Sequence, residues 1–186
     1  MVKAIMHGCN GKMGQVISNL AAADSDIEIV AGIDPHDDGH NAYPVYRSIF
    51  ECDIPADVII DFAAAGAVNN LLDYAVRKNI PVVLCTTGLS AEQLDKVEEA
   101  AKKVAVLKSA NMSLGINTLF KVLADVSPLL SAAGFDIEIV EKHHRLKVDA
   151  PSGTAITLAE GKKEAAILEA EAEKEAKKAV EEKTEK

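Results

Sequence analysis

The sequence contains no tryptophan, few aromatic residues and no excess of positive charge. Aromatic residues make up 4% of its 186 residues and hydrophobic residues 48%, so a core would be built mainly from aliphatic side chains. The formal net charge is −9 at pH 7. Nucleic acid requires clustered Lys and Arg, so we predict no nucleic-acid partner. A small anion can still bind to local cations and helix N-termini.

Long apolar runs and paired cysteines are also missing. No segment approaches the roughly 18 apolar residues that suggest a membrane span, and the first residues lack the apolar stretch of a signal peptide. Cys9, Cys52 and Cys85 are an odd number of widely spaced cysteines, without the spacing of a metal site. These features predict a cytoplasmic protein with free thiols, no membrane partner and no bound metal.

The first 110 residues alternate between short apolar runs and segments with helical spacing. The runs, which predict strands, lie at 2–8, 27–34, 56–63, 80–88 and 105–110, and the helical segments lie at 12–24, 67–79 and 90–104. Such alternation is typical of a parallel sheet with helices on both faces. The predicted fold class is therefore α/β, with a Rossmann-type doubly wound parallel sheet in a dinucleotide-binding domain over residues 1–112.

The predicted helices carry further signals. Apolar residues recur on one side of two helices and predict their buried faces: Met13, Val16, Ile17 and Leu20 in the first, and Val68, Leu71, Leu72, Ala75 and Val76 in the second. Ser90, with Gln93 three residues later, predicts a capping box at the start of the third helix.

The pattern changes after residue 112. Residues 116–130 predict a strongly apolar helix, and residues 135–144 alternate with period two, which predicts a half-exposed strand. Another helix begins near Pro151. Residues 161–186 are almost entirely Glu, Lys and Ala, which predicts an exposed helix with local ion pairs. We therefore expect an α+β segment over 113–160 and a charged helical tail over 161–186.

Three glycines lie between the first strand and the first helix with the spacing G-x-x-G-x-x-G: Gly8, Gly11 and Gly14. Glycine allows a sharp turn and a close approach to a diphosphate, and a helix N-terminus supplies free N–H groups. Asp34 ends the next strand, where an acid that binds a ribose belongs. The pattern predicts a dinucleotide site, and a glycine-rich turn without a ligand is the alternative.

Asp34 also bears on the choice of cofactor. Its carboxylate can accept hydrogen bonds from the ribose hydroxyls of NAD and would repel a 2′-phosphate. Lys12 is the one cation near it in the sequence. We therefore expect NADH to be the preferred cofactor and NADPH to be tolerated.

Four motifs occur in the order HGCNGKMG, CTTGLS, SANMSLGIN and EKHHRLKVDAPSGTA. Over about residues 1–160 they resemble the 4-hydroxy-tetrahydrodipicolinate reductases (dihydrodipicolinate reductases) of lysine and diaminopimelate biosynthesis. The resemblance implies a cytoplasmic oxidoreductase that reduces 4-hydroxy-tetrahydrodipicolinate to tetrahydrodipicolinate with NADH or NADPH. It also implies a small dicarboxylate substrate and a homotetramer.

The resemblance assigns roles to individual residues. His143 matches the general acid, and Lys147 matches a second acid or a cation for the substrate. His144, Ser152, Gly153 and Thr154 match the substrate pocket. The cofactor site matches Gly8, Asn10, Gly11, Lys12, Met13, Gly14, Asp34, Phe62, Thr86, Thr87, Gly88 and, in the hinge between domains, Asn111.

The residue types agree with these roles. A histidine is the natural proton donor near neutral pH, and a lysine beside a Ser-Gly-Thr helix start can hold carboxylates. An exposed histidine pair and an ordinary N-cap at Ser152 are the alternatives.

Two departures from the family pattern bear on function. Ala63, Ala64 and Ala65 stand where a Ser or Thr and a Pro are usual, and the loss of one hydrogen bond predicts roughly fivefold weaker cofactor binding. Secondly, the resemblance implies that residues 113–160 are only a fragment of an α+β substrate-binding domain, with an unrelated tail over 161–186 in place of the tetramer-forming strands. This truncation predicts a monomer or an altered oligomer. The alternative is a nucleotide-binding module, designed or trimmed, without turnover. An assembly element built on the charged helix ranks last.

Overall fold

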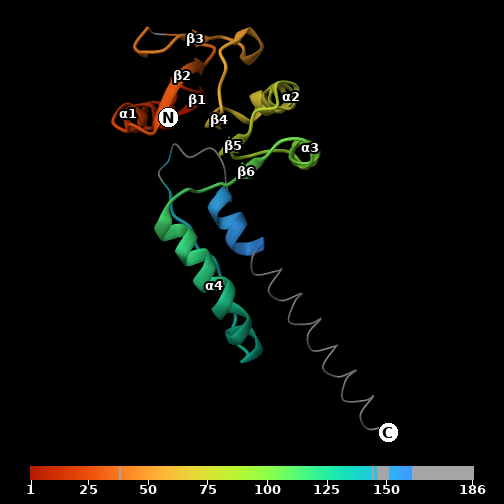
Figure 1. Cartoon of the computed structure of the whole chain (residues 1–186). Coiled ribbons are helices and arrows are strands. Elements are labelled where there is room, and N and C mark those ends of the chain that lie inside the picture. The colour runs from red at the N-terminus through yellow and green to blue at the C-terminus, as the bar shows by residue number, and fades with distance from the viewer. Residues whose placement is uncertain (38, 144, 146–150, 161–186) are drawn as a thin grey trace. The chain divides into compact units, whose positions relative to one another are not determined.

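The structure is a computed structural model that describes residues 1–37, 39–143, 145 and 151–160. It divides the chain into two compact units, Met1–Ala110 and Asn111–Lys186. Figure 1 shows the course of the chain through both. The charged helix predicted over residues 161–186 lies outside the described residues.

The first unit is built on a six-stranded sheet with the strand order β3-β2-β1-β4-β5-β6. Every neighbouring pair is parallel. The strands are β1 (Val2–His7), β2 (Ile27–Ile33), β3 (Val45–Tyr46), β4 (Val58–Asp61), β5 (Val82–Leu84) and β6 (Val106–Lys108). This order confirms the predicted doubly wound α/β fold, and it places the reversal of strand order between β1 and β4, where such sheets bind ligands.

Three helices of this unit cover the sheet. They are α1 (Lys12–Ala22), α2 (Val68–Lys78) and α3 (Ala91–Ala101), and two short 3-10 helices, η1 (Ile49–Glu51) and η2 (Ala65–Ala67), lie in the connections. Figure 1 shows α1 on one side of the sheet and α2 with α3 on the other. The predicted capping box of α3 is confirmed, because Ser90 Oγ accepts from the Gln93 N–H and the Gln93 side chain accepts from the Ser90 N–H.

The core lies between the sheet and α2. The buried face of α2 comprises Val68, Leu71, Leu72, Tyr74 and Ala75, which confirms four of the five predicted positions. Val76 is half-buried. These side chains pack in one cluster with the aliphatic residues of the central strands.

The predicted inner face of α1 is wrong at three of its four positions, and the fourth, Ile17, is half-buried. Met13, Val16 and Leu20 are 46%, 49% and 66% exposed, whereas the buried residues of α1 are Gly14 and Ala21. A Cβ at Gly14 would meet the carbonyl oxygen of Cys9 at 2.7 Å. The helix lies so close to the strand-to-helix turn that only small residues fit beneath it, and the apolar side chains point outward.

The second unit contains α4 (Leu114–Ala132) and a helix over residues 153–160. The strand predicted over 135–144 is wrong for its described part, because residues 135–143 form neither strand nor helix. A strand needs a partner for its backbone hydrogen bonds, and the described part of this unit contains no other strand. None of the helices in the described part of the chain combines the length and the hydropathy that a membrane span requires.

Candidate functional site

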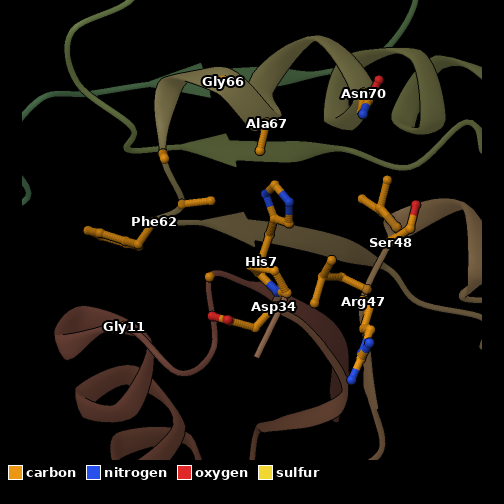
Figure 2. Close-up of a pocket in the computed structure, with 15 residues that line it drawn as sticks. His7, Gly11, Asp34, Arg47, Ser48, Phe62, Gly66, Ala67 and Asn70 are labelled. Carbon is orange, nitrogen blue, oxygen red and sulfur yellow. The ribbon is translucent and has the colours of Figure 1, made fainter. Parts of the chain in front are cut away.

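A cavity of about 610 Å³ opens beside the ends of β1, β2 and β4 in the first unit. Its size suits a small-molecule site. Of the predicted cofactor residues, it is lined by Gly8, Gly11, Asp34 and Phe62. Figure 2 shows this cavity with the residues around it.

The turn between β1 and α1 requires glycine at both of its ends. Gly8 has a φ of +81°, and a Cβ there would meet the carbonyl oxygen of Phe62 at 2.8 Å. The turn is closed by a hydrogen bond from the Gly11 N–H to the Gly8 carbonyl oxygen, over 3.1 Å. At the other end, Gly14 lies under the same backbone. The predicted glycine pattern thus produces a tight loop whose backbone borders the cavity.

Helix α1 begins in this loop without a side-chain cap. Its N-cap is Gly11, which makes no capping hydrogen bond, and Lys12 and Met13 in its first turn are exposed. The first N–H groups of a helix have no partner within the helix, and they lie at its positive end. An anion can therefore bind at the start of α1, whereas the start of α3 is closed by its capping box.

Asp34 holds the loop as well as lining the cavity. One carboxylate oxygen accepts from the Asn10 N–H over 3.1 Å, and the other accepts from the His36 N–H over 3.0 Å. The Asn10 side chain donates to the His36 carbonyl oxygen. A carboxylate has about four acceptor sites, so both oxygens can accept a further bond. Burial, followed by the charge of Asp34, raises the pKa of the nearby Cys9 thiol to about 11.

Arg47 was not anticipated as a site residue. It directly follows β3 and lines the same cavity as Asp34. It forms no ion pair with any residue that the structure describes. Strand β3 is only two residues long and pairs with Gly32 and Ile33. A run this short carries no periodic signal, so nothing in the sequence predicted that Arg47 would reach this cavity.

Thr86, which was predicted to bind the cofactor, lies in a buried hydrogen-bond network. Its hydroxyl is 2.6 Å from Asp61 Oδ2, and the other oxygen of Asp61 is 2.6 Å from Nδ1 of His7. Thr87 and Gly88 are exposed in the loop after β5 and do not line the cavity. The structure therefore groups Thr86 with His7 and Asp61, and the contact of Thr86, Thr87 and Gly88 with a cofactor stays a prediction.

In the second unit the structure brings two predicted residues together through Glu141. The Glu141 carboxylate accepts from the Ser152 N–H over 2.9 Å, and its other oxygen is 3.5 Å from Nδ1 of His143. Ser152 is buried, and its hydroxyl accepts from the Ala155 N–H over 3.1 Å. Ser152 therefore acts as an N-cap, as the alternative interpretation expected. The role of Glu141 was missed because it lies eleven residues before Ser152 in the sequence, and no local pattern links residues that far apart.

Of the remaining predicted residues, some lie in this cluster and the others lie outside the described residues. Asn111 belongs to the second unit, where its side-chain amide donates to the Thr154 hydroxyl over 3.2 Å. Gly153 begins the helix over 153–160. His144 and Lys147 lie outside the described residues. Within the described part of the chain, no three His, Cys, Asp or Glu side chains are grouped so that they could hold a metal ion.

Comparison with known proteins places this site in a family. The family model "Dihydrodipicolinate reductase, N-terminus" matches residues 2–112, and "Dihydrodipicolinate reductase, C-terminus" matches residues 115–185. The second match runs through most of the segment rich in Glu, Lys and Ala, which was expected to be unrelated. The pairwise alignments with the two curated relatives described next cover only 158 and 160 residues.

Individual relatives and a solved structure indicate the same family as the family models. The chain is 52% identical over 158 residues to the 4-hydroxy-tetrahydrodipicolinate reductase of Clostridium novyi (strain NT), covering 85% of this chain and 62% of that protein. It is 49% identical over 160 residues to that of Caldanaerobacter subterraneus subsp. tengcongensis, with 86% and 62% covered. A solved structure, dipicolinate-bound dihydrodipicolinate reductase from Paenisporosarcina sp. TG-14, aligns with a TM-score of 0.69 and 29% identity, over 89% of this chain and 66% of that one.

The chain therefore spans less than two thirds of the length of these relatives. Within that span, both family models match in order, and the sheet is doubly wound, as the sequence predicted. The chain belongs to the dihydrodipicolinate reductase family.

Proposed function

We propose that this chain carries the nucleotide-binding unit and part of the substrate-binding unit of a 4-hydroxy-tetrahydrodipicolinate reductase. The reaction is the reduction of 4-hydroxy-tetrahydrodipicolinate, a small dicarboxylate, with a pyridine dinucleotide, in lysine and diaminopimelate biosynthesis. The names of the curated relatives support this substrate.

The observation that carries the proposal is the arrangement around the cavity of the first unit. The Gly8–Gly11 turn, the uncapped start of α1 and the carboxylate of Asp34 all border one space at the reversal of strand order. Free N–H groups there suit a diphosphate, and a carboxylate suits ribose hydroxyls. A Cβ at Gly8 would overlap the backbone of Phe62 and Ala63, so any other residue at this position would displace the loop that borders the cavity.

A bound pyridine dinucleotide would supply a hydride. In our proposal, the N–H groups of Lys12, Met13 and Gly14 at the start of α1 bind its diphosphate, and Asp34 holds the adenosine ribose. The backbone of Gly8, Asn10 and Gly11, whose N–H groups are donated within the protein, shapes the turn that borders it. We propose NADH as the preferred cofactor because the Asp34 carboxylate repels a 2′-phosphate. Arg47 lines the same cavity and offers a cation, which supports the use of NADPH as well.

The second unit would bind the substrate and supply a proton. We propose His143 as the proton donor, with Lys147 as a second cation or acid and with His144, Ser152, Gly153 and Thr154 in the substrate pocket. Glu141 lies 3.5 Å from His143 and also binds Ser152, so it can hold the proton donor beside the helix start. The solved relative is described as dipicolinate-bound, and dipicolinate is a planar dicarboxylate of related shape.

A nucleotide-binding module without turnover is the second candidate. It is favoured by the lack of strand structure over 135–143 and by the 41% exposure of the His143 side chain. A proton donor that is poorly held loses rate steeply with misplacement. The two candidates share the cofactor site and differ only in chemistry.

Two measurements separate the candidates. Titration of the full chain with NADH, followed by nucleotide fluorescence, should show saturable binding, and its absence would exclude both. NADH oxidation with freshly prepared 4-hydroxy-tetrahydrodipicolinate should be faster for the unmodified chain than for the double variant His143→Ala, Lys147→Ala. Equal rates in the presence of normal NADH binding would leave the module without turnover.

A further inference from the structure

His7 is a buried polar residue at the mouth of the glycine turn. It ends β1, directly before Gly8, and it is 5% exposed. It lies just outside the glycine motif and was not predicted to bind a ligand. In the structure it lines the same cavity as Gly8, Gly11 and Asp34.

Asp61 fixes the orientation of the His7 ring. Nδ1 of His7 lies 2.6 Å from Oδ1 of Asp61, which is fully buried at the end of β4. The same carboxylate faces the Thr86 hydroxyl over 2.6 Å and the Ala63 N–H over 3.3 Å. Two donors, the Thr86 hydroxyl and the Ala63 N–H, already face this carboxylate, so Asp61 acts as an acceptor and we assign the donor role in the third contact to Nδ1 of His7. This contact leaves the ring one orientation, with Nε2 on the far side from Asp61.

Nε2 is the polar atom that remains for a ligand. It forms no hydrogen bond with the residues that the structure describes, and it is not among their fully enclosed atoms without a partner. Figure 2 shows the ring standing within the cavity, between Asp34 and the loop of Gly66 and Ala67. Because Nε2 is not fully enclosed and His7 lines the cavity, a ligand in the cavity can reach this atom.

We propose that His7 is a further cofactor-binding residue: Nε2 forms a hydrogen bond with an oxygen of the ribose–diphosphate portion of the dinucleotide, and Asp61 positions the ring for it. This inference rests on the proposed function, because it assumes that the cavity holds a dinucleotide. The partner oxygen belongs to a phosphate if Nε2 is protonated and donates, and to a ribose hydroxyl if Nε2 is unprotonated and accepts.

The variant His7→Asn tests the contact of Nε2 separately from the contact of Nδ1. An asparagine amide can take the place of Nδ1 and donate to Asp61, so the buried network keeps its contact, but nothing replaces Nε2. We expect the dissociation constant for NADH to rise about tenfold, the effect of one such hydrogen bond, with little change in melting temperature. His40→Asn is the matched control, because His40 is exposed in a polar loop, and it should leave NADH binding unchanged.

A spectroscopic measurement on the unmodified chain makes the test independent of any variant. In protein labelled with ¹⁵N in histidine, the Nε2 signal of His7, assigned by its loss in His7→Asn, should shift when NADH saturates the chain. The direction of the shift distinguishes a bond donated to phosphate from one accepted from ribose. An unmoved signal, together with unchanged NADH affinity in His7→Asn, would overturn the inference while leaving the proposed function intact. Failure of the unmodified chain to bind NADH would overturn both.

Discussion

The carboxylate of Glu141 accepts a hydrogen bond from the backbone N–H of Ser152, over 2.9 Å. Ser152 precedes a helix, and its own hydroxyl accepts from the Ala155 N–H. A negative charge at a helix start is favourable because the free N–H groups and the helix dipole lie there. The sequence predicted a carboxylate of the substrate at this position, and the structure shows that a carboxylate of the chain itself binds one of its N–H groups.

Replacement of Glu141 tests whether this contact holds the helix start. Glu141→Ala removes the acceptor, so we expect amide hydrogen exchange at Ser152 to become about tenfold faster. Glu141→Gln retains a side-chain oxygen in the same place and should change this rate little. Exchange measured by NMR at Ser152 checks the prediction, and equal rates in the two variants would show that the contact contributes nothing to local stability.

Thr86→Val should destabilise the first unit. The change keeps the shape of the side chain but removes a donor from Asp61, which is fully buried. A buried acceptor that loses a partner costs about 1–3 kcal/mol in the free energy of unfolding. Thr87→Val is the control, because Thr87 is exposed and should change that free energy by less than about 0.5 kcal/mol. Denaturant unfolding measures both, and similar values for the two variants would argue against the network.

Gly8→Ala should be more damaging than Gly66→Ala. Gly8 has a φ of +81°, and a Cβ there would lie 2.8 Å from a carbonyl oxygen. The left-handed conformation alone costs an alanine about 1–2 kcal/mol, and the overlap adds to it. At Gly66 no atom lies within 4 Å of a new Cβ, so its stability should be unchanged or slightly higher. Melting temperatures of the two variants give the comparison, and equal losses would show that the turn is not constrained as described.

Arg47→Ala should affect NADPH more than NADH. Arg47 lines the cavity that contains Asp34, whereas Lys12 is exposed and does not line it. If Arg47 faces the 2′-phosphate, its removal should raise the KM for NADPH by about tenfold, the size of one charge-assisted contact, with a smaller effect for NADH. Lys12→Ala should change the ratio of the two KM values less. The reverse order would identify Lys12 as the relevant cation, as the sequence alone suggested.

The parallel sheet and the glycine turn could be predicted from sequence because their signals are local. Strands buried on both faces are continuous apolar runs. The turn requires glycine at position 8, because the φ there is positive and a Cβ would overlap neighbouring backbone atoms. The buried face of α2 was also predictable, since its apolar residues recur with helical spacing. That Asp34 belongs to the site was predictable from its place at the end of β2, and Asp34 does line the cavity.

The predictions that failed concern features that tertiary packing determines. Spacing on α1 showed an apolar face, but Gly14 and Ala21 determine which face lies against the sheet. The alternation over 135–144 predicted a strand, yet alternation cannot supply a partner for one. His7 and Arg47 are single polar residues in or beside strands. Their place in the cavity depends on how β1 and β3 align within the sheet, and no local pattern records this.

The central claim is that the cavity beside the Gly8–Gly11 turn binds a pyridine dinucleotide. The most direct test is a fluorescence titration of the full chain with NADH, followed by competition with ADP-ribose, which lacks the nicotinamide but keeps the diphosphate and both riboses. We predict saturable binding that ADP-ribose displaces. A fluorescence signal that never saturates, or one that ADP-ribose leaves unchanged, would contradict the account.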